Sequence, residues 1–379
     1  MRKLIHSIKV GIALVLVSLL YLLDPLYKQV GENAMWAIMT VVVVFEFSAG
    51  ATLGKGINRG IGTILGGGMG CLVAILADEL GVIGHAVAAG TSVFLFGAAA
   101  TYFRLVPSIK RRYDYGVLIF ILTFNLVVVS GLRADEVINL ARERLSTIGM
   151  GFAVCIFTSL LFFPQWAGDE LHCSIASKFE KLACCIEECM EEYFSLINKK
   201  ENQLSINFNT CKSVLYSKSS DDSLANFARW EPWHGKFGLS YPWSKYQQIG
   251  DVLRELAATI VSLKGCLQSP RQPSSVLRQL IKEPSEAVGS SLAWTLRELG
   301  QSIRKMERCR SKELKEQKMG SIKQELSLVI SSSRLRAAEE SERLAMASLL
   351  FLLMEIMEKV EELAKEVDEL GEAANFKSK

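Results

Sequence analysis

Long apolar runs alternate with short polar linkers over the first 166 residues of the chain, and this alternation stops afterwards. Six windows approach the roughly 20 predominantly apolar residues that a helix needs to cross a bilayer. They cover residues 5–23, 34–53, 57–77, 83–103, 115–132 and 145–163. The third window is rich in glycine, which membrane helices tolerate because lipid offers the backbone no other hydrogen-bond partner. The pattern predicts an all-α fold that begins with six transmembrane helices.

The remaining residues, 167–379, have the composition of a soluble helical domain. They hold 30 Lys+Arg and 31 Asp+Glu, whereas residues 1–166 hold only 13 and 9. Residues 167–200 form an amphipathic pattern, and helical periodicity returns from Gln247. Between them, Pro232 and Pro242 exclude an uninterrupted helix, so we expect a structured loop region over residues 201–245. We therefore divide the chain into a membrane domain, residues 1–166, and a helical regulatory domain, residues 167–379.

Apolar residues near the C-terminus recur at alternating intervals of three and four, which is typical of a coiled-coil seam. The series consists of Met346, Leu349, Leu353, Ile356, Val360, Leu363, Val367 and Leu370. Such a seam packs either against a second copy of the chain or against helices of the same protomer, and the sequence leaves both open. The apolar run inside it, residues 345–354, is too short to span a bilayer.

Lysine and arginine are concentrated in alternate linkers, which predicts how the helices are oriented in the membrane. The N-terminus and the second and fourth linkers are basic, so we place them in the cytosol, and an even number of spans places the C-terminal domain there too. Their basic residues are Arg2, Lys3 and Lys9, then Lys55 and Arg59, then Arg104, Lys110, Arg111 and Arg112. The fifth linker should face outward, yet it holds Arg133, Arg142 and Arg144. Either this orientation is wrong or some of these arginines act inside a pore.

Charged residues inside or beside the apolar windows are the candidate functional residues. Glu46 lies near the middle of an apolar run, and a charge at that depth costs about 2.5–3.5 kcal/mol on insertion scales. Lys55 and Arg59 are one helical turn apart, whereas Arg142 and Arg144 are two residues apart and do not share a face. These cations either lie at the membrane edge, paired with Glu46 or lipid phosphates, or line a conduit for a small anion.

Two further patterns in the apolar windows have a structural explanation. Glycines recur every fourth residue in the third window, which lets two helices approach closely in lipid. Aromatic residues near the span ends fit an interfacial belt. The glycines are Gly62, Gly66 and Gly70, and the aromatic residues are Trp36, Tyr102 and Tyr115.

Several long strings occur in a fixed order along the chain. They are WAIMTVVVVFEFSAGATLGKGINRGIGT at 36–63, RRYDYGV at 111–117, RERLST at 142–147, FPQWAGDELH at 163–172 and WEPWHGKF at 230–237. In these strings the chain resembles the plant aluminium-activated malate transporter family, over residues 2 to about 265. The remaining residues match less distinctly. The first span begins almost at residue 1, so we expect the cytosolic leader of many relatives to be short or missing.

The resemblance implies a homodimeric channel that passes malate, other dicarboxylates and inorganic anions. Two protomers of six spans would share one pore lined by basic residues, for which we carry over Lys55, Arg59 and Arg144. Arg142, at the start of the sixth span, is a further candidate for the pore, and Glu46 is the candidate intramembrane charge partner. The family does not by itself assign aluminium activation. We expect a multi-pass protein of the plasma membrane, with the vacuolar membrane as the alternative. The WEP residues, Trp230, Glu231 and Pro232, are either structural or couple the soluble domain to the membrane domain.

Other classes of protein find little support in the sequence. The net charge of +3 is not gathered into a basic stripe, so we expect no nucleic-acid partner. Four scattered histidines form no catalytic or metal-binding group with other residues, so we expect neither an enzyme nor a cofactor. Cys184, Cys185 and Cys189 share one helix, and we interpret them as small buried residues rather than a soft-metal site. The main alternative is a membrane-anchored helical signalling or scaffold protein without conductance.

Overall fold

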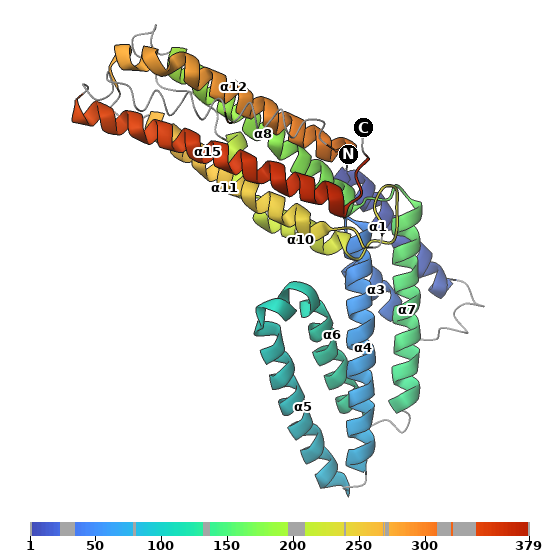
Figure 1. Ribbon diagram of the computed structural model, residues 1–379. Coiled ribbons are helices and arrows are strands. Elements are labelled where there is room, and N and C mark those ends of the chain that lie inside the picture. Colours follow the sequence, from blue (N-terminus) through green and yellow to red (C-terminus); the bar gives the residue numbers. More distant parts are fainter. Residues whose placement is uncertain are drawn as a thin grey trace. The chain divides into compact units, whose positions relative to one another are not determined.

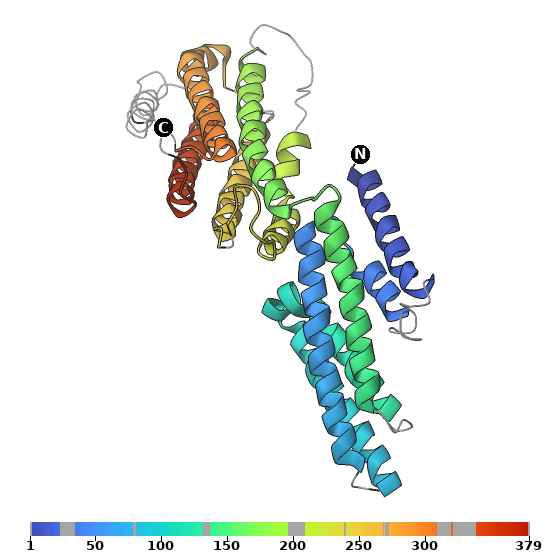
Figure 2. The same ribbon diagram turned by 90° about the vertical axis from the view of Figure 1, so that its right-hand side faces the viewer.

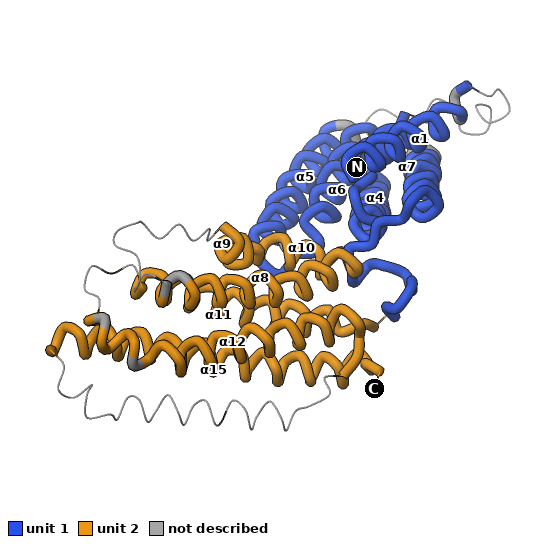
Figure 3. Tube along the Cα trace, turned by 90° about the horizontal axis from the view of Figure 1, so that it is seen from above, with its two compact units in different colours: residues 1–167, 226–239 blue, residues 168–225, 240–379 orange. Residues whose placement is uncertain are grey.

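The computed structural model describes residues 2–22, 35–78, 81–131, 137–195, 209–238, 240–267, 269, 273–308, 320 and 339–377. Every regular element within these ranges is a helix, so the prediction of an all-α protein is confirmed. The chain forms two compact units, coloured separately in Figure 3. Unit 1 comprises Met1–Ala167 and Asn226–Leu239, and unit 2 comprises Gly168–Ala225 and Ser240–Lys379. The sequence predicts a single boundary after residue 166, and it does not predict that residues 226–239 belong to unit 1.

Unit 1 contains the apolar helices. They are α1 (Arg2–Leu22), α3 (Met35–Val44), α4 (Ala49–Asp78), α5 (Gly81–Leu105), α6 (Pro107–Gly131) and α7 (Val137–Leu161), labelled in Figure 1. Within the described part of the chain, four stretches are long and apolar enough to cross a membrane: Ala49–Ala77, Ile83–Leu105, Arg112–Ser130 and Arg142–Leu161. The ten-residue α3 is apolar but short. The protein is therefore a membrane protein, and the number of six spans remains a prediction.

The boundary drawn between the second and third apolar windows is wrong. The helix is interrupted at residues 45–48, and α4 then runs for 30 residues without a break, which corresponds to about 45 Å. Ser48 begins this helix as its N-cap, because the Ser48 hydroxyl oxygen accepts a hydrogen bond from the backbone N–H of Ala51 at 3.2 Å. Lys55 and Arg59 consequently lie inside a continuous helix and not in a linker.

The glycines of α4 allow this helix to approach α6 closely. A Cβ atom added to Gly66 would lie 2.7 Å from the backbone oxygen of Phe120 on α6, and one on Gly70 would lie 2.9 Å from Val127 Cβ. A Cβ on Gly62 would meet the backbone oxygen of Gly116 even more closely. The prediction that these glycines serve helix packing is confirmed. On its other side α4 runs beside α7, as Figures 1 and 2 both show.

Unit 2 is a set of helices with a buried apolar interior. They are α8 (Ala167–Ser195), α9 (Asn209–Leu215), α10 (Lys218–Ala228), α11 (Trp243–Leu267), α12 (Ser275–Lys305) and α15 (Glu340–Ala373). The expected loop region over residues 201–245 is partly wrong, because α9 and α10 fall inside it. Buried Asp221 anchors α10, because its carboxylate accepts hydrogen bonds from Lys178 on α8 and Arg254 on α11.

The heptad seam of α15 is buried within the protomer. All eight predicted positions, from Met346 to Leu370, have side chains no more than 2% exposed. The helix packs chiefly against α11 and also against α12. Of the two explanations that the sequence left open, packing within one protomer is the one that the structure shows. Cys185 and Cys189 of α8 are likewise buried, as expected of small core residues.

Candidate functional site

Two of the predicted pore arginines line the same cavity in unit 1. Arg59 reaches it from α4 and Arg144 from α7. The cavity measures 20 Å³, about the space needed by one water molecule. Besides the arginines its lining consists of Trp36, Thr63, Ile119, Leu122, Thr123, Leu126 and Ile148. Four helices, α3, α4, α6 and α7, thus bring two cations together that lie 85 positions apart in the sequence.

Arg59 is almost completely buried, with 7% of its surface exposed. Its Nη1 donates a hydrogen bond to the hydroxyl oxygen of Tyr115 on α6 at 3.1 Å. Its Nε is buried and has no hydrogen-bond partner among the described residues. The Thr63 hydroxyl, one turn further along α4, is buried and unpaired within the same limits. Both side chains therefore retain unused hydrogen-bonding capacity at the cavity.

Arg144 has even more unused capacity. Its guanidinium carbon lies 5.0 Å from the ring centre of Trp36, a distance suited to a cation–π interaction. Both Nε and Nη1 are buried and lack a hydrogen-bond partner in the part of the chain that the structure describes. A buried cationic donor without an acceptor is costly, so these groups favour a site where an acceptor, such as water or an anion, arrives from outside.

The other predicted site residues lie elsewhere. Lys55 forms an ion pair with Glu46, and both side chains remain about one third exposed, at 36% and 31%. Glu46 lies in the interruption between α3 and α4, where its backbone N–H donates a hydrogen bond to the Thr52 hydroxyl at 3.0 Å, and its role as an intramembrane charge partner stays a prediction. Arg142 is exposed, although only two residues separate it from Arg144. Helical spacing accounts for this difference, since residues two apart point to different faces.

The aromatic partners of the two arginines do not follow from the sequence pattern. Trp36 and Tyr115 are predicted to belong to an interfacial belt, yet each contacts a cavity arginine. One signal was available, namely the spacing of four between Arg59 and Thr63, which places both polar side chains on one face of α4. No comparable spacing in the sequence indicates that Tyr115 of α6 contacts Arg59.

The WEP residues pack on the beginning of α4 within unit 1. A Cβ atom on Gly54 would lie 2.9 Å from the ring of Trp230, so this glycine provides the seat for the indole. The side chain of Glu231 is 1% exposed, and its carboxylate accepts a hydrogen bond from the backbone N–H of Ala167 at 2.5 Å. The carbonyl of Pro232 lies 2.9 Å from His234 Nδ1. The segment thus joins the start of α4 to the chain that follows α7.

Comparison with known proteins now identifies the family. A family model described as aluminium activated malate transporter matches residues 1–335. The chain belongs to the aluminium-activated malate transporter family. The resemblance inferred from the ordered strings is confirmed, and it extends beyond the 265 or so residues over which it was expected.

Relatives within the aluminium-activated malate transporter family are similar over most or all of this chain. Aluminum-activated malate transporter 13 of Arabidopsis thaliana is 45% identical over 342 residues, which cover 88% of this chain and 63% of that protein. Transporter 12 of the same plant is 46% identical over 309 residues, which cover 81% and 55%. Transporter 2 is 40% identical over 382 residues, which cover 100% and 76%. The chain thus spans about three fifths of the length of the first two relatives. Their names are those of transporters and not of enzymes.

Proposed function

We propose that this protein is a passive channel for malate, other dicarboxylates and inorganic anions. Its membership of the aluminium-activated malate transporter family supports the substrate class. The observation that carries the proposal is the convergence of Arg59 and Arg144 on one cavity, with three buried guanidinium N–H groups unpaired among the described residues. Such donors suit an anion that enters and leaves, because no resident acceptor competes for them.

The chemistry of the arginines favours carboxylates. An anion that enters the membrane loses water, and fixed positive charge with unpaired N–H donors compensates for this loss. A guanidinium is planar and presents two N–H groups to the two oxygens of a carboxylate. Cations are repelled by the same pair of charges. Lys55 contributes less to the local field, because Glu46 neutralises it.

The direction of flow follows from the membrane potential. Moving one charge through 100 mV is worth about 2.3 kcal/mol, so a malate dianion gains about 4.6 kcal/mol. Malate therefore leaves a negatively charged cytosol without any other source of energy. We place the chain in the plasma membrane with both ends of the membrane domain in the cytosol.

A homodimer with a shared pore fits the size of the cavity. The space between Arg59 and Arg144 in one protomer holds about one water molecule, which is too little for malate. A conduit between two protomers would widen this space while keeping the four arginines of the pair at its wall. In such a dimer the apolar faces of the unit 1 helices that lie away from the conduit would contact lipid.

The WEP segment is suited to couple the soluble domain to this pore. Helix α10 begins in unit 2 and ends in unit 1, where Trp230 seats on Gly54, five residues before Arg59. Gly54→Ala would push the indole away, whereas Gly60→Ala adds a methyl group into open space. We expect the first change to alter channel opening and the second to leave it unchanged in single-channel recordings. Equal recordings from both variants would remove this role from the segment.

The decisive experiment is transport by the purified chain in liposomes. The vesicles are loaded with malate, and a potassium gradient across their membrane sets the potential when valinomycin is added. We expect malate efflux to speed up as the inside-negative potential increases and to slow down when the potential is reversed. A membrane-anchored signalling or scaffold protein would give efflux equal to that of protein-free vesicles, and that result would overturn the proposal.

A further inference from the structure

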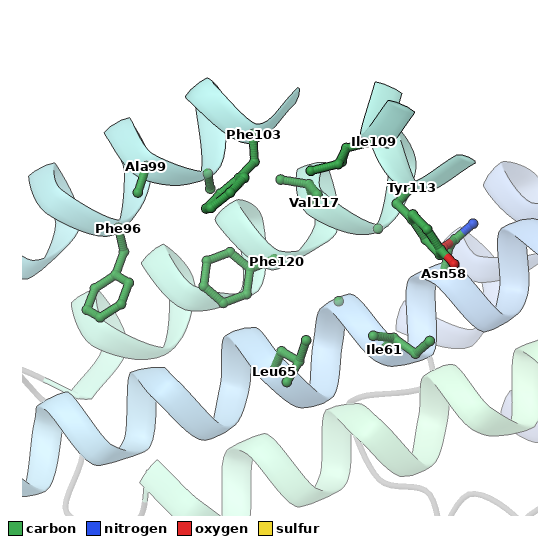
Figure 4. Close-up of a pocket in the computed structure, with 13 residues that line it drawn as sticks. Asn58, Ile61, Leu65, Phe96, Ala99, Phe103, Ile109, Tyr113, Val117 and Phe120 are labelled. Carbon is green, nitrogen blue, oxygen red and sulfur yellow. The ribbon is translucent and has the colours of Figure 1, made fainter. Parts of the chain in front are cut away.

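A second and much larger cavity lies between α4, α5 and α6. It measures 370 Å³, within the range of about 300–1,000 Å³ that is typical of ligand sites. Figure 4 shows its lining, in which each helix contributes residues at intervals of three and four. These residues are Asn58, Ile61, Gly62 and Leu65 from α4, Phe96, Ala99, Ala100 and Phe103 from α5, and Ile109, Tyr113, Gly116, Val117 and Phe120 from α6. None of them belongs to the cavity of the two arginines.

An apolar cluster joins α5 to α4 and α6 beyond one end of the cavity. Buried Ala89, Phe124 and Val128 form a cluster there, with Met69 and Val93 packed against it. Towards the turn at Val106 that joins α5 to α6, the side chains of α4 lose this cover. Ile61 and Leu65 are 46% and 56% exposed.

The polarity of the lining is uneven along the cavity. Figure 4 places Asn58 and Tyr113 at one end and Phe96 at the other, with apolar side chains between them. The amide of Asn58 donates to the backbone oxygen of Arg112 at 3.2 Å, and the Arg112 guanidinium carbon lies 5.9 Å from the Tyr113 ring. Cationic charge therefore adjoins the polar end, and it is absent from the lining itself.

Two cations near this end, Lys110 and Arg112, are exposed, although the Arg112 guanidinium carbon also lies 5.9 Å from the Trp230 ring centre. Arg104 is already engaged, because it donates two hydrogen bonds to Asp114, at 2.8 and 3.2 Å. Neither Lys110 nor Arg112 forms an ion pair with another residue that the structure describes. A long apolar space with a cationic rim matches a molecule with an apolar tail and an anionic head.

The geometry points to a binding site for an anionic phospholipid, independent of the proposed channel function. One acyl chain fills the space between Phe96 and Tyr113, and the head-group phosphate lies against Lys110 and Arg112. Malate does not fit this lining, because its carboxylates would lose water and meet no cation within the cavity, only the Asn58 amide and the Tyr113 hydroxyl at one end. An acyl chain loses nothing on entry, and it restores the dispersion contacts that an empty space denies to its walls. Asn58 and Gly62 lie one turn apart on α4 and both contact α6, so they hold the polar end of the cavity against α6 while the acyl chain occupies the rest.

The test uses the full chain purified in detergent, with native mass spectrometry to count bound lipid. Phosphatidylglycerol and phosphatidylcholine with identical acyl chains are added separately. Ala99→Phe fills the cavity, and Ala98→Phe makes the same change on the neighbouring residue, which is exposed and outside the lining. Each methylene kept out of the cavity lowers affinity about fourfold, so we expect Ala99→Phe to weaken phosphatidylglycerol binding by about tenfold or more. Ala98→Phe should bind as the unchanged protein does.

Lys110→Gln tests the head group separately, with Lys3→Gln, an exposed position on α1, as its control. We expect Lys110→Gln to reduce binding of phosphatidylglycerol and to leave that of phosphatidylcholine unchanged. Equal lipid binding by Ala99→Phe and Ala98→Phe would overturn the proposal. Ile61→Cys provides an independent check, because quantitative disulfide cross-linking between protomers in liposomes would show that a second copy of the chain occupies the space.

Discussion

Replacing Arg144 by glutamine is the sharpest test of the cavity of the two arginines. The change removes the positive charge and the two buried N–H groups, Nε and Nη1, that lack a partner in the described structure. A hydrogen bond to a charged group contributes about 1.5–3 kcal/mol. If a permeating malate makes one such bond more than glutamine can replace, the loss is about 2 kcal/mol, or about 30-fold in malate affinity. The contact with Trp36 disappears as well.

The assay is the initial rate of malate efflux from liposomes at a fixed potential, measured over a series of malate concentrations. The matched control is Arg142→Gln on the same helix, two residues away and exposed. Both variants lose one positive charge, so they change the long-range field alike. We expect Arg144→Gln to require about 30-fold more malate for half-maximal efflux, and Arg142→Gln to change this concentration less than twofold.

Two results would refute the reasoning about Arg144. Equal losses in both variants would show that only the net charge near the membrane matters. Efflux at the unchanged rate in Arg144→Gln would remove this residue from the route of the anion. Arg144→Lys adds a further check, because it keeps the charge and loses the planar pair of donors. We expect it to recover part of the affinity and not all of it.

Two further predictions concern the stability of each unit. Gly66→Ala should destabilise the contact of α4 with α6 by about 1–3 kcal/mol, because the new methyl group meets a backbone oxygen at 2.7 Å, whereas Gly68→Ala, which faces open space, should leave the thermal unfolding temperature in detergent unchanged. In unit 2, hydrogen bonds from Arg297 hold the pKa of Glu187 below its ordinary value, so this stabilisation is complete above about pH 5 and is lost as pH falls towards the lowered pKa. Glu187→Gln should therefore speed hydrogen exchange in α8 at pH 7 and make the exchange rate depend less on pH. The expected loss of stability is about 0.5–1 kcal/mol, because the ion pair is partly exposed. The control Glu188→Gln, at an exposed position, should change neither. An unchanged exchange rate in Glu187→Gln would contradict the claim that the ion pair of Arg297 and Glu187 stabilises α8.

Hydrophobic periodicity was sufficient to predict most of the helices. The seam of α15 shows this best, because its spacing of three and four is a local property that the packing preserves. The start of α4 was not found, although Ser48 is a standard N-cap residue. The long apolar run on both sides of Ser48 concealed the break, since hydropathy averages over about 20 residues and a cap acts through one.

The candidate site was predicted residue by residue but not as an arrangement. Charge beside the apolar windows singled out Arg59 and Arg144, which line one cavity, and it singled out Arg142 and Lys55 with equal weight. The difference between them depends on which neighbours each side chain meets. Glu46 reaches Lys55 because the helix breaks at residues 45–48, and Arg142 is exposed because it lies on a different face of α7 from Arg144. These are properties of helix packing, and the spacing of residues along the chain does not reveal them.

The membrane unit is discontinuous along the chain, and this affects how it can be cut from the protein. A fragment that stops at Ala167 keeps every apolar helix of unit 1 but lacks residues 226–239. It would uncover Gly50 and Gly54, and it would leave the backbone N–H of Ala167 without the carboxylate that accepts its hydrogen bond. Expression of the isolated apolar half therefore yields an incomplete unit, and co-expression of the missing piece of chain is needed to restore it.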